Sequence, residues 1–238
     1  MNMIFPPYLD DLLGKGIAWE ICKARTEQAL IDHPEDIIQI LHAQSMLHHT
    51  YEKNEECLET NFRLLELPID QEYASHVHNS IACCYAETQR IEKAVEHYLK
   101  AYETYPEFGE CLFNLGELYI GRFEWDNAIE TFEKLRTDYL WQDEAFEKLG
   151  YLYTIKQDYA KSRDCYLEGY KLAPEDEFWA ERVASQFYNL KQYDESETWF
   201  RSWPRAQPLP AGPGSAGESA FSYVRQNLPT SLRILTRS

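Results

Sequence analysis

Long apolar runs and a basic N-terminal leader are missing from this chain of 238 residues. No segment of 18 consecutive apolar residues occurs, and the opening MNMIFPPYLDDLL carries no positive charge ahead of an apolar stretch. These absences argue against a membrane span and against a secretory signal peptide. We therefore expect a cytoplasmic protein that does not insert into membranes.

Paired cysteine motifs are missing as well. The six cysteines have neither a CxxC pair nor a regular spacing, and they stand at Cys22, Cys57, Cys83, Cys84, Cys111 and Cys165. Scattered cysteines are typical of small buried side chains in a reducing compartment, and not of a disulfide framework. Cysteine usage thus also points to the cytoplasm.

Motifs that carry catalysis or nucleotide binding are lacking too. The sequence has no GxSxG nucleophile elbow and no HExxH zinc motif. Gly14, Lys15 and Gly16 form a GKG without the preceding strand and the spacing of a phosphate-binding loop. We expect a protein that is not an enzyme and that has no cofactor.

Basic residues are few, with 23 Lys and Arg against 40 Asp and Glu and a formal net charge of −17. Such acidity repels nucleic-acid phosphates and anionic membranes and attracts cationic partners. We therefore expect no nucleic-acid binding. Two interpretations of the acidity stay open, since it either keeps the protein soluble or selects a basic partner.

What the sequence does have is a pattern that recurs every 34 residues. The first part of each unit repeats His78, Ile81, Ala82, Tyr85; Leu112, Leu115, Gly116, Tyr119; Phe146, Leu149, Gly150, Tyr153; and Ala180, Val183, Ala184, Phe187. The second part repeats Ala94, Tyr98, Ala101; Ala128, Phe132, Leu135; Ser162, Tyr166, Gly169; and Ser196, Phe200, Trp203. Spacings of three and four residues place each set on one face of a helix. Each unit is predicted to be a helical hairpin whose small residues let the two helices approach closely.

This pattern resembles the tetratricopeptide repeat family, whose signature is W-x2-L-G-x2-Y, then A-x3-F, then a proline. The resemblance implies an all-α fold, a right-handed superhelical solenoid of helical hairpins with units near residues 41, 75, 109, 143 and 177. The unit near 41 fits less well, because His48 stands where a small residue belongs. We expect the array to cover residues 41–208 and to follow irregular helices in residues 1–40.

In arrays of this family the first helices line a concave groove that holds the partner, so the resemblance also implies which side chains face it. Glutamates and aromatic residues at these positions predict an acidic surface with aromatic anchors for a basic peptide or helical segment. The alternative is a solvated helix face. The predicted peptide-binding residues are Asn79, Glu110, Phe113, Asn114, Glu117, Glu144, Glu147, Lys148, Tyr151, Phe178, Glu181 and Arg182.

In one subgroup of the family, the groove forms a carboxylate clamp that binds acidic chaperone tails. Asn79, Asn114 and Lys148 lie near the positions of that clamp. The sequence departs from that pattern, because no unit pairs a lysine at its fifth position with an asparagine at its ninth. Glutamates also surround the three candidates. The sequence therefore favours a basic partner over an acidic tail.

Five of the seven histidines fall on two adjacent predicted helices, at His42, His48, His49, His76 and His78. His42 and His49 share a helix face and His76 comes from the next unit, so three imidazoles within reach of a zinc ion are an alternative hypothesis. The protein would then be a metal-dependent enzyme or sensor. The competing interpretation is unrelated packing and surface histidines, because His78 takes a core position of the repeat.

The C-terminal composition changes abruptly, which predicts a linker over residues 209–217 and a basic segment with a short helix over 218–238. From Arg205 onward the chain carries four arginines and one glutamate, a net +3, so residues 1–204 carry −20. Three interpretations stay open: this segment caps the last repeat, docks in the acidic groove, or is a foreign extension.

These features predict a cytoplasmic adaptor or chaperone that binds a basic segment of a partner protein, or its own C-terminal segment, in the groove. A secretion-type chaperone or a toxin-neutralising protein is the alternative among binding proteins.

Overall fold

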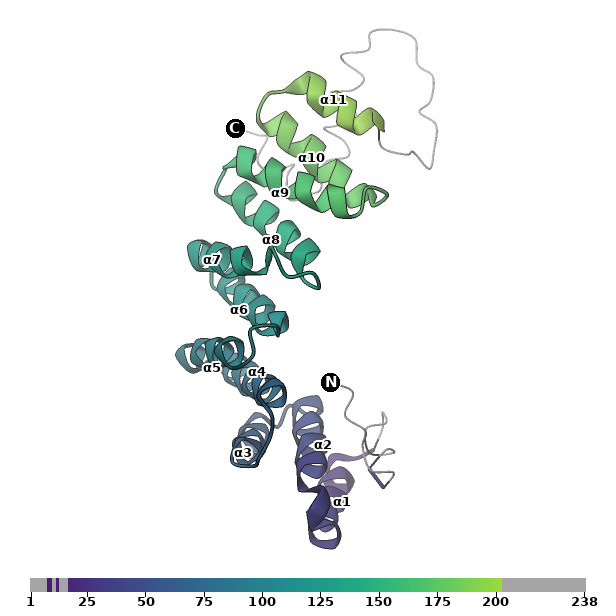
Figure 1. Cartoon of the computed structure of the whole chain (residues 1–238), viewed down its shortest axis with the longest axis vertical. Helices are drawn as coiled ribbons and strands as arrows, with labels where there is room; N and C mark the ends of the chain where they lie inside the picture. Colours follow the sequence, from purple (N-terminus) through teal and green to yellow (C-terminus); the bar gives the residue numbers. More distant parts are fainter. Residues whose placement is uncertain (1–7, 10–11, 13–16, 203–238) are drawn as a thin grey trace. The chain divides into compact units, whose positions relative to one another are not determined.

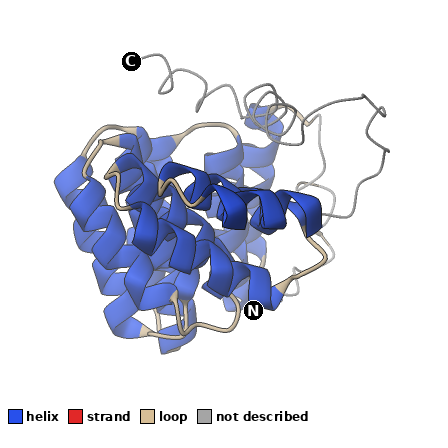
Figure 2. Ribbon diagram, turned by 90° about the horizontal axis from the view of Figure 1, so that it is seen from above, coloured by secondary structure: helices blue, strands red, loops and turns tan. Residues whose placement is uncertain are grey.

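The computed structural model describes residues 8, 9, 12 and 17–202. Every regular element in this part of the chain is a helix, and no strand occurs in it (Figures 1 and 2). The all-α prediction is therefore confirmed. The predicted linker at 209–217 and the basic segment at 218–238 lie outside the described residues.

The described residues form eleven α-helices and one short 3₁₀ helix. None of these helices is long and apolar enough to cross a membrane. In chain order they are α1 (Trp19–Asp32), η1 (Pro34–Asp36), α2 (Ile37–Thr50), α3 (Asn54–Leu65), α4 (Gln71–Glu87), α5 (Ile91–Thr104), α6 (Gly109–Gly121), α7 (Trp125–Leu135), α8 (Gln142–Ile155), α9 (Tyr159–Leu172), α10 (Glu177–Asn189) and α11 (Tyr193–Ser202).

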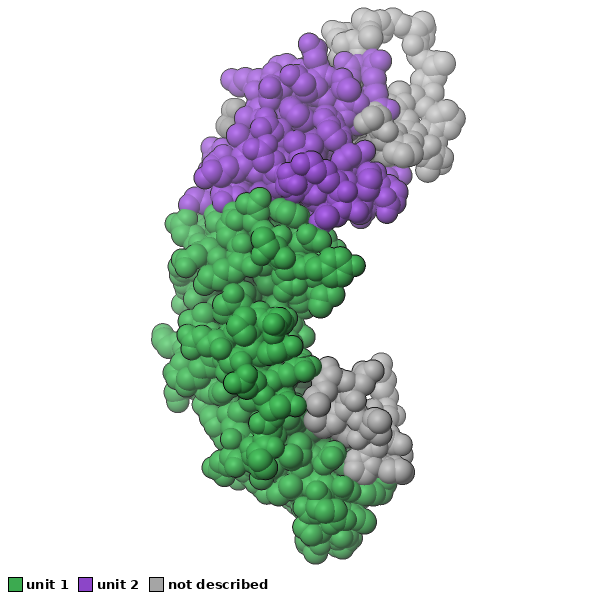
Figure 3. Space-filling model, in the orientation of Figure 1, with its two compact units in different colours: residues 1–152 green, residues 153–238 purple. Residues whose placement is uncertain are grey.

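The chain divides into two compact units, residues 1–152 and 153–238 (Figure 3). Unit 1 holds α1 to α7 and α8 as far as Leu152. Unit 2 holds the end of α8 and helices α9 to α11.

In unit 1 the helices pack as a stack of hairpins. Helix α2 packs on α3, α4 on α5 and α6 on α7, while α3 also packs on α4 and α5 on α6. Helices α2, α4 and α6 consequently lie along one side of the stack, and α3, α5 and α7 lie along the other (Figure 1). This arrangement is the helical solenoid that the 34-residue pattern predicts.

Small side chains allow the paired helices of unit 1 to approach closely. Ala82, Ala94 and Ala128 are completely buried. Gly116 of α6 faces the buried ring of Phe132 on α7, and a Cβ atom on Gly116 would lie 2.5 Å from two ring carbons. The glycine is therefore needed for the close approach of the backbone to this ring.

Each hairpin turn contains one residue that is not glycine and has a left-handed backbone conformation. These residues are Glu52, Gln89, Phe123, Gln157 and Lys191, with φ values of 55°, 60°, 61°, 60° and 61°. At Gln89, the residue's own N–H donates to the Ala86 carbonyl at 3.0 Å and the next N–H donates to the Tyr85 carbonyl at 2.8 Å. The same two bonds recur at the other four turns. They form a Schellman motif, which satisfies the last carbonyls of the first helix and directs the chain into the second.

The residues before α2 pack against it in unit 1. Leu9, Leu12 and Cys22 form a buried cluster with Ile40 and Leu47 of α2. Residues 17–36 thus supply one 14-residue helix and one short 3₁₀ helix at the start of the stack.

In unit 2, α10 packs on both α9 and α11. Gly169 of α9 lies against the buried indole of Trp179 on α10, which leaves no room for a Cβ atom. The Ser196 hydroxyl donates to the Ala184 carbonyl at 2.9 Å and joins α11 to α10. The small residues predicted from the repeat are therefore the ones that bring these helices together.

Candidate functional site

Two asparagines join neighbouring first helices in unit 1. The Asn114 side-chain amide on α6 donates to the Asn79 side-chain oxygen on α4 at 3.2 Å. Asn79 is only 7% exposed. This residue therefore holds α4 against α6, and Asn114 is the half-buried member of the pair.

An ion pair joins α6 to α8. The Lys148 Nζ lies 2.9 Å from the Glu117 Oε1, outside the geometry of an aligned hydrogen bond. The same Nζ lies 5.5 Å from the ring centre of Phe113. Lys148 is thus held between a carboxylate and an aromatic face, and its charge is balanced by Glu117.

Phe113 packs within the helices and does not stand free in solvent. Its ring lies 5.2 Å from the Trp141 ring and meets the Phe132 ring edge-on at 6.0 Å. Trp141, just before α8, was not predicted as a site residue. Tyr73 lies two repeat lengths earlier at the start of α4, but Glu107 and Glu175 take this position in the adjoining repeats, so the pattern gave no consistent signal for an aromatic residue.

Helix α8 carries an acidic stripe. Glu144, Glu147 and Tyr151 follow each other at helical spacing, and Tyr151 is 48% exposed. Burial and the adjacent Asp143 carboxyl raise the pKa of Glu144 above its usual range, and the bond to Glu144 lowers that of Asp143. The Glu144 Oε2 atom is buried and has no hydrogen-bond partner in the described part of the chain. This oxygen therefore lacks the cation or donor that would offset its burial, although the carboxyl group is bonded to Asp143.

The loop before α8 exposes two large apolar side chains. Tyr139 is 85% exposed and Leu140 is 70% exposed. The Leu140 N–H donates to the Asp138 carboxylate at 2.9 Å, which fixes the turn. Sequence reasoning missed these residues because they lie outside the repeat pattern.

Glu110 is exposed in the first turn of α6. With Glu144 and Glu147, it makes the α6 and α8 side of unit 1 acidic. We call the surface formed by Glu110, Phe113, Glu117, Glu144, Glu147, Lys148 and Tyr151 the acidic face.

The remaining predicted site residues belong to α10 in unit 2. The Arg182 guanidinium lies 5.0 Å from the ring centre of Phe178, and that ring meets the Trp179 ring edge-on at 5.0 Å. Glu181 is partly exposed beside them on the same helix. Arg182 and Phe178 are thus engaged with each other within α10.

The five clustered histidines each have a separate local contact. His42 Nδ1 lies 2.9 Å from the Tyr73 hydroxyl and His48 Nδ1 lies 3.2 Å from the Thr60 hydroxyl. His49 Nδ1 lies 3.7 Å from a Glu87 oxygen.

The two histidines of α4 also have different neighbours. The His76 ring packs 4.0 Å from the ring of Phe108, and His78 Nδ1 lies 3.1 Å from His97 Nδ1. Burial lowers the pKa of both His76 and His78. Among the described residues, His33, Glu35 and Asp36 are the three side chains whose potential metal-ligating atoms lie close together. The five histidines of the predicted cluster do not form such a group.

Sequence models of the tetratricopeptide repeat match residues 75–108, 110–139 and 143–176. No curated protein matches the chain. Among solved structures, MamA has a TM-score of 0.56 at 14% identity, covering 70% of this chain and 90% of that one. PilF from Pseudomonas aeruginosa has a TM-score of 0.54 at 15% identity, covering 74% and 79%.

A tetratricopeptide repeat protein from Parabacteroides merdae has a TM-score of 0.54 at 18% identity, covering 77% of this chain and 72% of that one. At such identities these structures show the shared fold alone. The matched segments begin where the sequence pattern places its units near 75, 109 and 143. The repeat models and the helical fold together identify the chain as a member of the tetratricopeptide repeat family.

Proposed function

We propose that the protein is a non-enzymatic adaptor whose acidic face binds a basic segment of a partner protein. Repeat arrays of this kind serve as protein-interaction scaffolds, and their specificity resides in the side chains that the helices present. The acidic face combines carboxylates on α6 and α8 with the exposed ring of Tyr151. A segment that alternates Lys or Arg with apolar residues would complement both.

The observation that carries this proposal is the buried, unpartnered Oε2 atom of Glu144. Burial of a carboxylate oxygen without a partner costs free energy, and burial, followed by the Asp143 carboxyl, raises the pKa of Glu144. An ammonium or guanidinium group from a partner would offset the cost and favour the ionised carboxylate. Glu144 is therefore the carboxylate that gains most from a basic ligand.

Lys148 is the basic residue of the acidic face, and its charge is already engaged. Because its ammonium group is already held by Glu117 and the Phe113 ring, it does not oppose a basic ligand as a free lysine would. Glu110, Glu144 and Glu147 then supply the negative field.

The chain's own residues 217–238 are a suitable basic probe, since they contain Arg225, Arg233 and Arg237 among apolar residues. We include this segment among the proposed ligands and place the protein in the cytoplasm. A chaperone function would use the same surface to shield a basic segment of a partner.

The test measures binding of a labelled synthetic peptide of residues 217–238 to the full-length protein. We expect Glu147→Lys to weaken binding by about tenfold, the effect of about 1.4 kcal/mol. Glu103→Lys, an exposed residue of α5 on the other side of the stack, makes the same change of net charge and should leave affinity nearly unchanged. Equal weakening by both variants would show that net charge alone drives binding and would contradict a site on the acidic face.

A second variant tests the opposite sign. Lys148→Gln frees Glu117 and should tighten peptide binding by about twofold to fivefold, as expected for an exposed charge. Lys134→Gln on α7 is the matched control, because Lys134 also neighbours a glutamate, Glu130, at 4.0 Å. Binding that weakens with Lys148→Gln would place the peptide elsewhere.

A further inference from the structure

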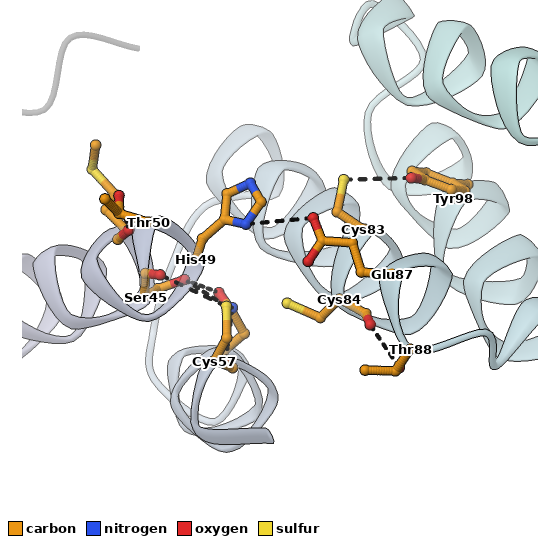
Figure 4. A network of polar contacts seen from close by, with 11 residues as sticks. Ser45, His49, Thr50, Cys57, Cys83, Cys84, Glu87, Thr88 and Tyr98 are labelled. Atoms are coloured by element: carbon orange, nitrogen blue, oxygen red, sulfur yellow. Dashed lines mark hydrogen bonds and ion pairs between the residues drawn. The ribbon is translucent and has the colours of Figure 1, made fainter. Parts of the chain in front are cut away.

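Two buried cysteines of unit 1 face each other across neighbouring helices. Cys57 lies near the start of α3 and Cys84 near the end of α4, and each is 1% exposed. Helices α3 and α4 pack together, and each of the two thiols shifts the pKa of the other. Figure 4 shows the Cys84 side chain directed toward the helix that carries Cys57.

The adjacent Cys83 has a different environment. Its sulfur lies 3.4 Å from the Tyr98 hydroxyl of α5, on the other side of α4 (Figure 4). Consecutive residues of a helix point about 100° apart, so only one of the two cysteines can face α3. Cys83 is therefore a natural control for Cys84.

Polar neighbours make Cys57 the more reactive sulfur of the pair. Besides Cys84, the Asn61 side-chain amide donates to the Cys57 sulfur at 3.3 Å, and the Ser45 hydroxyl lies 3.7 Å away. The hydrogen bond with Cys84, followed by those with Ser45 and Asn61, lowers the pKa of Cys57 despite its burial. The bond to Cys57 and burial raise the pKa of Cys84. The pair thus joins a sulfur whose pKa is lowered to one whose pKa is raised.

The pair lies close to partly exposed side chains. The charge of Glu87 acts on both sulfurs, and the Glu87 side chain is 42% exposed. His49, whose Nδ1 is 3.7 Å from Glu87, is 59% exposed. Partly exposed side chains therefore adjoin the buried pair.

We propose that Cys57 and Cys84 form an intramolecular disulfide when the protein meets hydrogen peroxide. The Cys57 thiolate attacks the peroxide oxygen, an S–O bond forms, the O–O bond breaks, and the departing hydroxide takes a proton to become water. The Cys84 sulfur then attacks the sulfenic sulfur, and the S–S bond forms as the S–O bond breaks. The Cys84 proton leaves with the departing hydroxide as a second water. The two thiols lose two electrons and two protons, and these reduce the peroxide to two waters.

The disulfide would join the second helix of one hairpin to the first helix of the next. Because repeat arrays are held together by contacts between neighbouring units, a covalent link at this interface should raise the thermal unfolding midpoint of unit 1. A thiol reductant would return the protein to its original midpoint.

The test treats the reduced full-length protein with hydrogen peroxide, blocks the remaining thiols and digests it with trypsin without reduction. Cleavage after Arg63 places Cys57 and Cys84 on different peptides, so mass spectrometry detects the cross-link directly. We expect the linked peptide in the wild type and in Cys83→Ser, and its loss in Cys84→Ser. In Cys84→Ser, a dimedone adduct should appear on Cys57, because its sulfenic acid has no resolving thiol.

Cys111 is an internal control for burial alone. It donates to the Phe108 carbonyl at 2.9 Å, and burial raises its pKa to about 12. It should remain unoxidised while the disulfide forms. The proposal is overturned if Cys83→Ser abolishes the cross-link, if Cys111 oxidises as fast as Cys57, or if the linked peptide forms only in denaturant. Circular dichroism of each variant, with Cys84→Ala as a second substitution, separates these outcomes from a failure to fold.

Discussion

At the scale of single residues, two glycines of α6 have opposite roles. Gly116 leaves no space for a Cβ atom beside the ring of Phe132, whereas nothing lies within 4 Å of a Cβ added to Gly121. Alanine normally favours a helix over glycine by about 1 kcal/mol. The environment therefore decides whether the same substitution helps or harms.

Gly116→Ala should lower the free energy of unfolding by about 1–3 kcal/mol, because the buried Phe132 ring has to shift. Gly121→Ala should raise it by up to about 1 kcal/mol. Urea denaturation followed by circular dichroism measures both. A stabilising Gly116→Ala would mean that the α6–α7 interface can adjust without cost.

His97 makes stability depend on pH. Burial, followed by the neighbouring His78, lowers the pKa of His97 to about 4. The unfolded state, with a histidine pKa of about 6.5, binds a proton at higher pH than the folded state does. Stability from this group is therefore complete above about pH 6.5 and falls as the pH drops toward 4.

His97→Gln should remove part of this dependence, on the order of 1–2 kcal/mol between pH 7 and pH 4 after allowance for solvent screening. Thermal unfolding midpoints of the wild type and the variant at a series of pH values provide the measurement. Parallel curves for the two proteins would show that His97 is not the responsible group.

At the scale of the elements, the hairpin turns adopt a left-handed conformation without glycine. This conformation costs a residue with a side chain about 1–2 kcal/mol. Gln157→Gly in unit 2 and Gln89→Gly in unit 1 should each raise the free energy of unfolding by about 1 kcal/mol. Gln89→Ala keeps the Cβ atom and is the control, expected to give no gain. Equal effects of alanine and glycine in denaturation experiments would refute strain as the cause.

The helices and their close contacts could be predicted from the sequence, because the spacing of apolar and small side chains determines which faces meet. Gly116 against Phe132 follows directly from that spacing. The conformation of the turns could not be predicted, since Phe123 and its equivalents lack the glycine that signals a left-handed residue. Contacts between neighbouring repeats, such as Asn79 with Asn114, depend on how one hairpin stacks on the next, and the sequence pattern does not show this.

The sequence indicated which residue types form the candidate site more fully than how their side chains pack. The carboxylates of α8 stand on one helix at the expected spacing. Phe113, predicted as an anchor for a ligand, packs against Trp141, and the large exposed side chains nearby are Tyr139 and Leu140. A loop outside the repeat pattern gives no periodicity from which its exposure can be read.

At the scale of the whole molecule, charge should govern the rate of association. The chain carries a net charge of −17, and residues 1–204 carry −20. The association rate constant of the 217–238 peptide should fall by about one order of magnitude between low and high salt, because ions screen long-range attraction. Stopped-flow fluorescence measures this rate. A peptide with its three arginines replaced by glutamine is the control, and a similar salt effect on it would exclude electrostatic steering.

The extensive packing among the described helices joins neighbours, or next neighbours, along the chain. Most contacts therefore join residues that are near in sequence, so only short loops have to form, and this favours rapid folding. A ribosome releases such a chain from its N-terminus, so each hairpin can form on the one already made before the rest is synthesised. Folding of the nascent protein can thus follow the order of its repeats, because no helix needs a distant segment to be translated before it can pack.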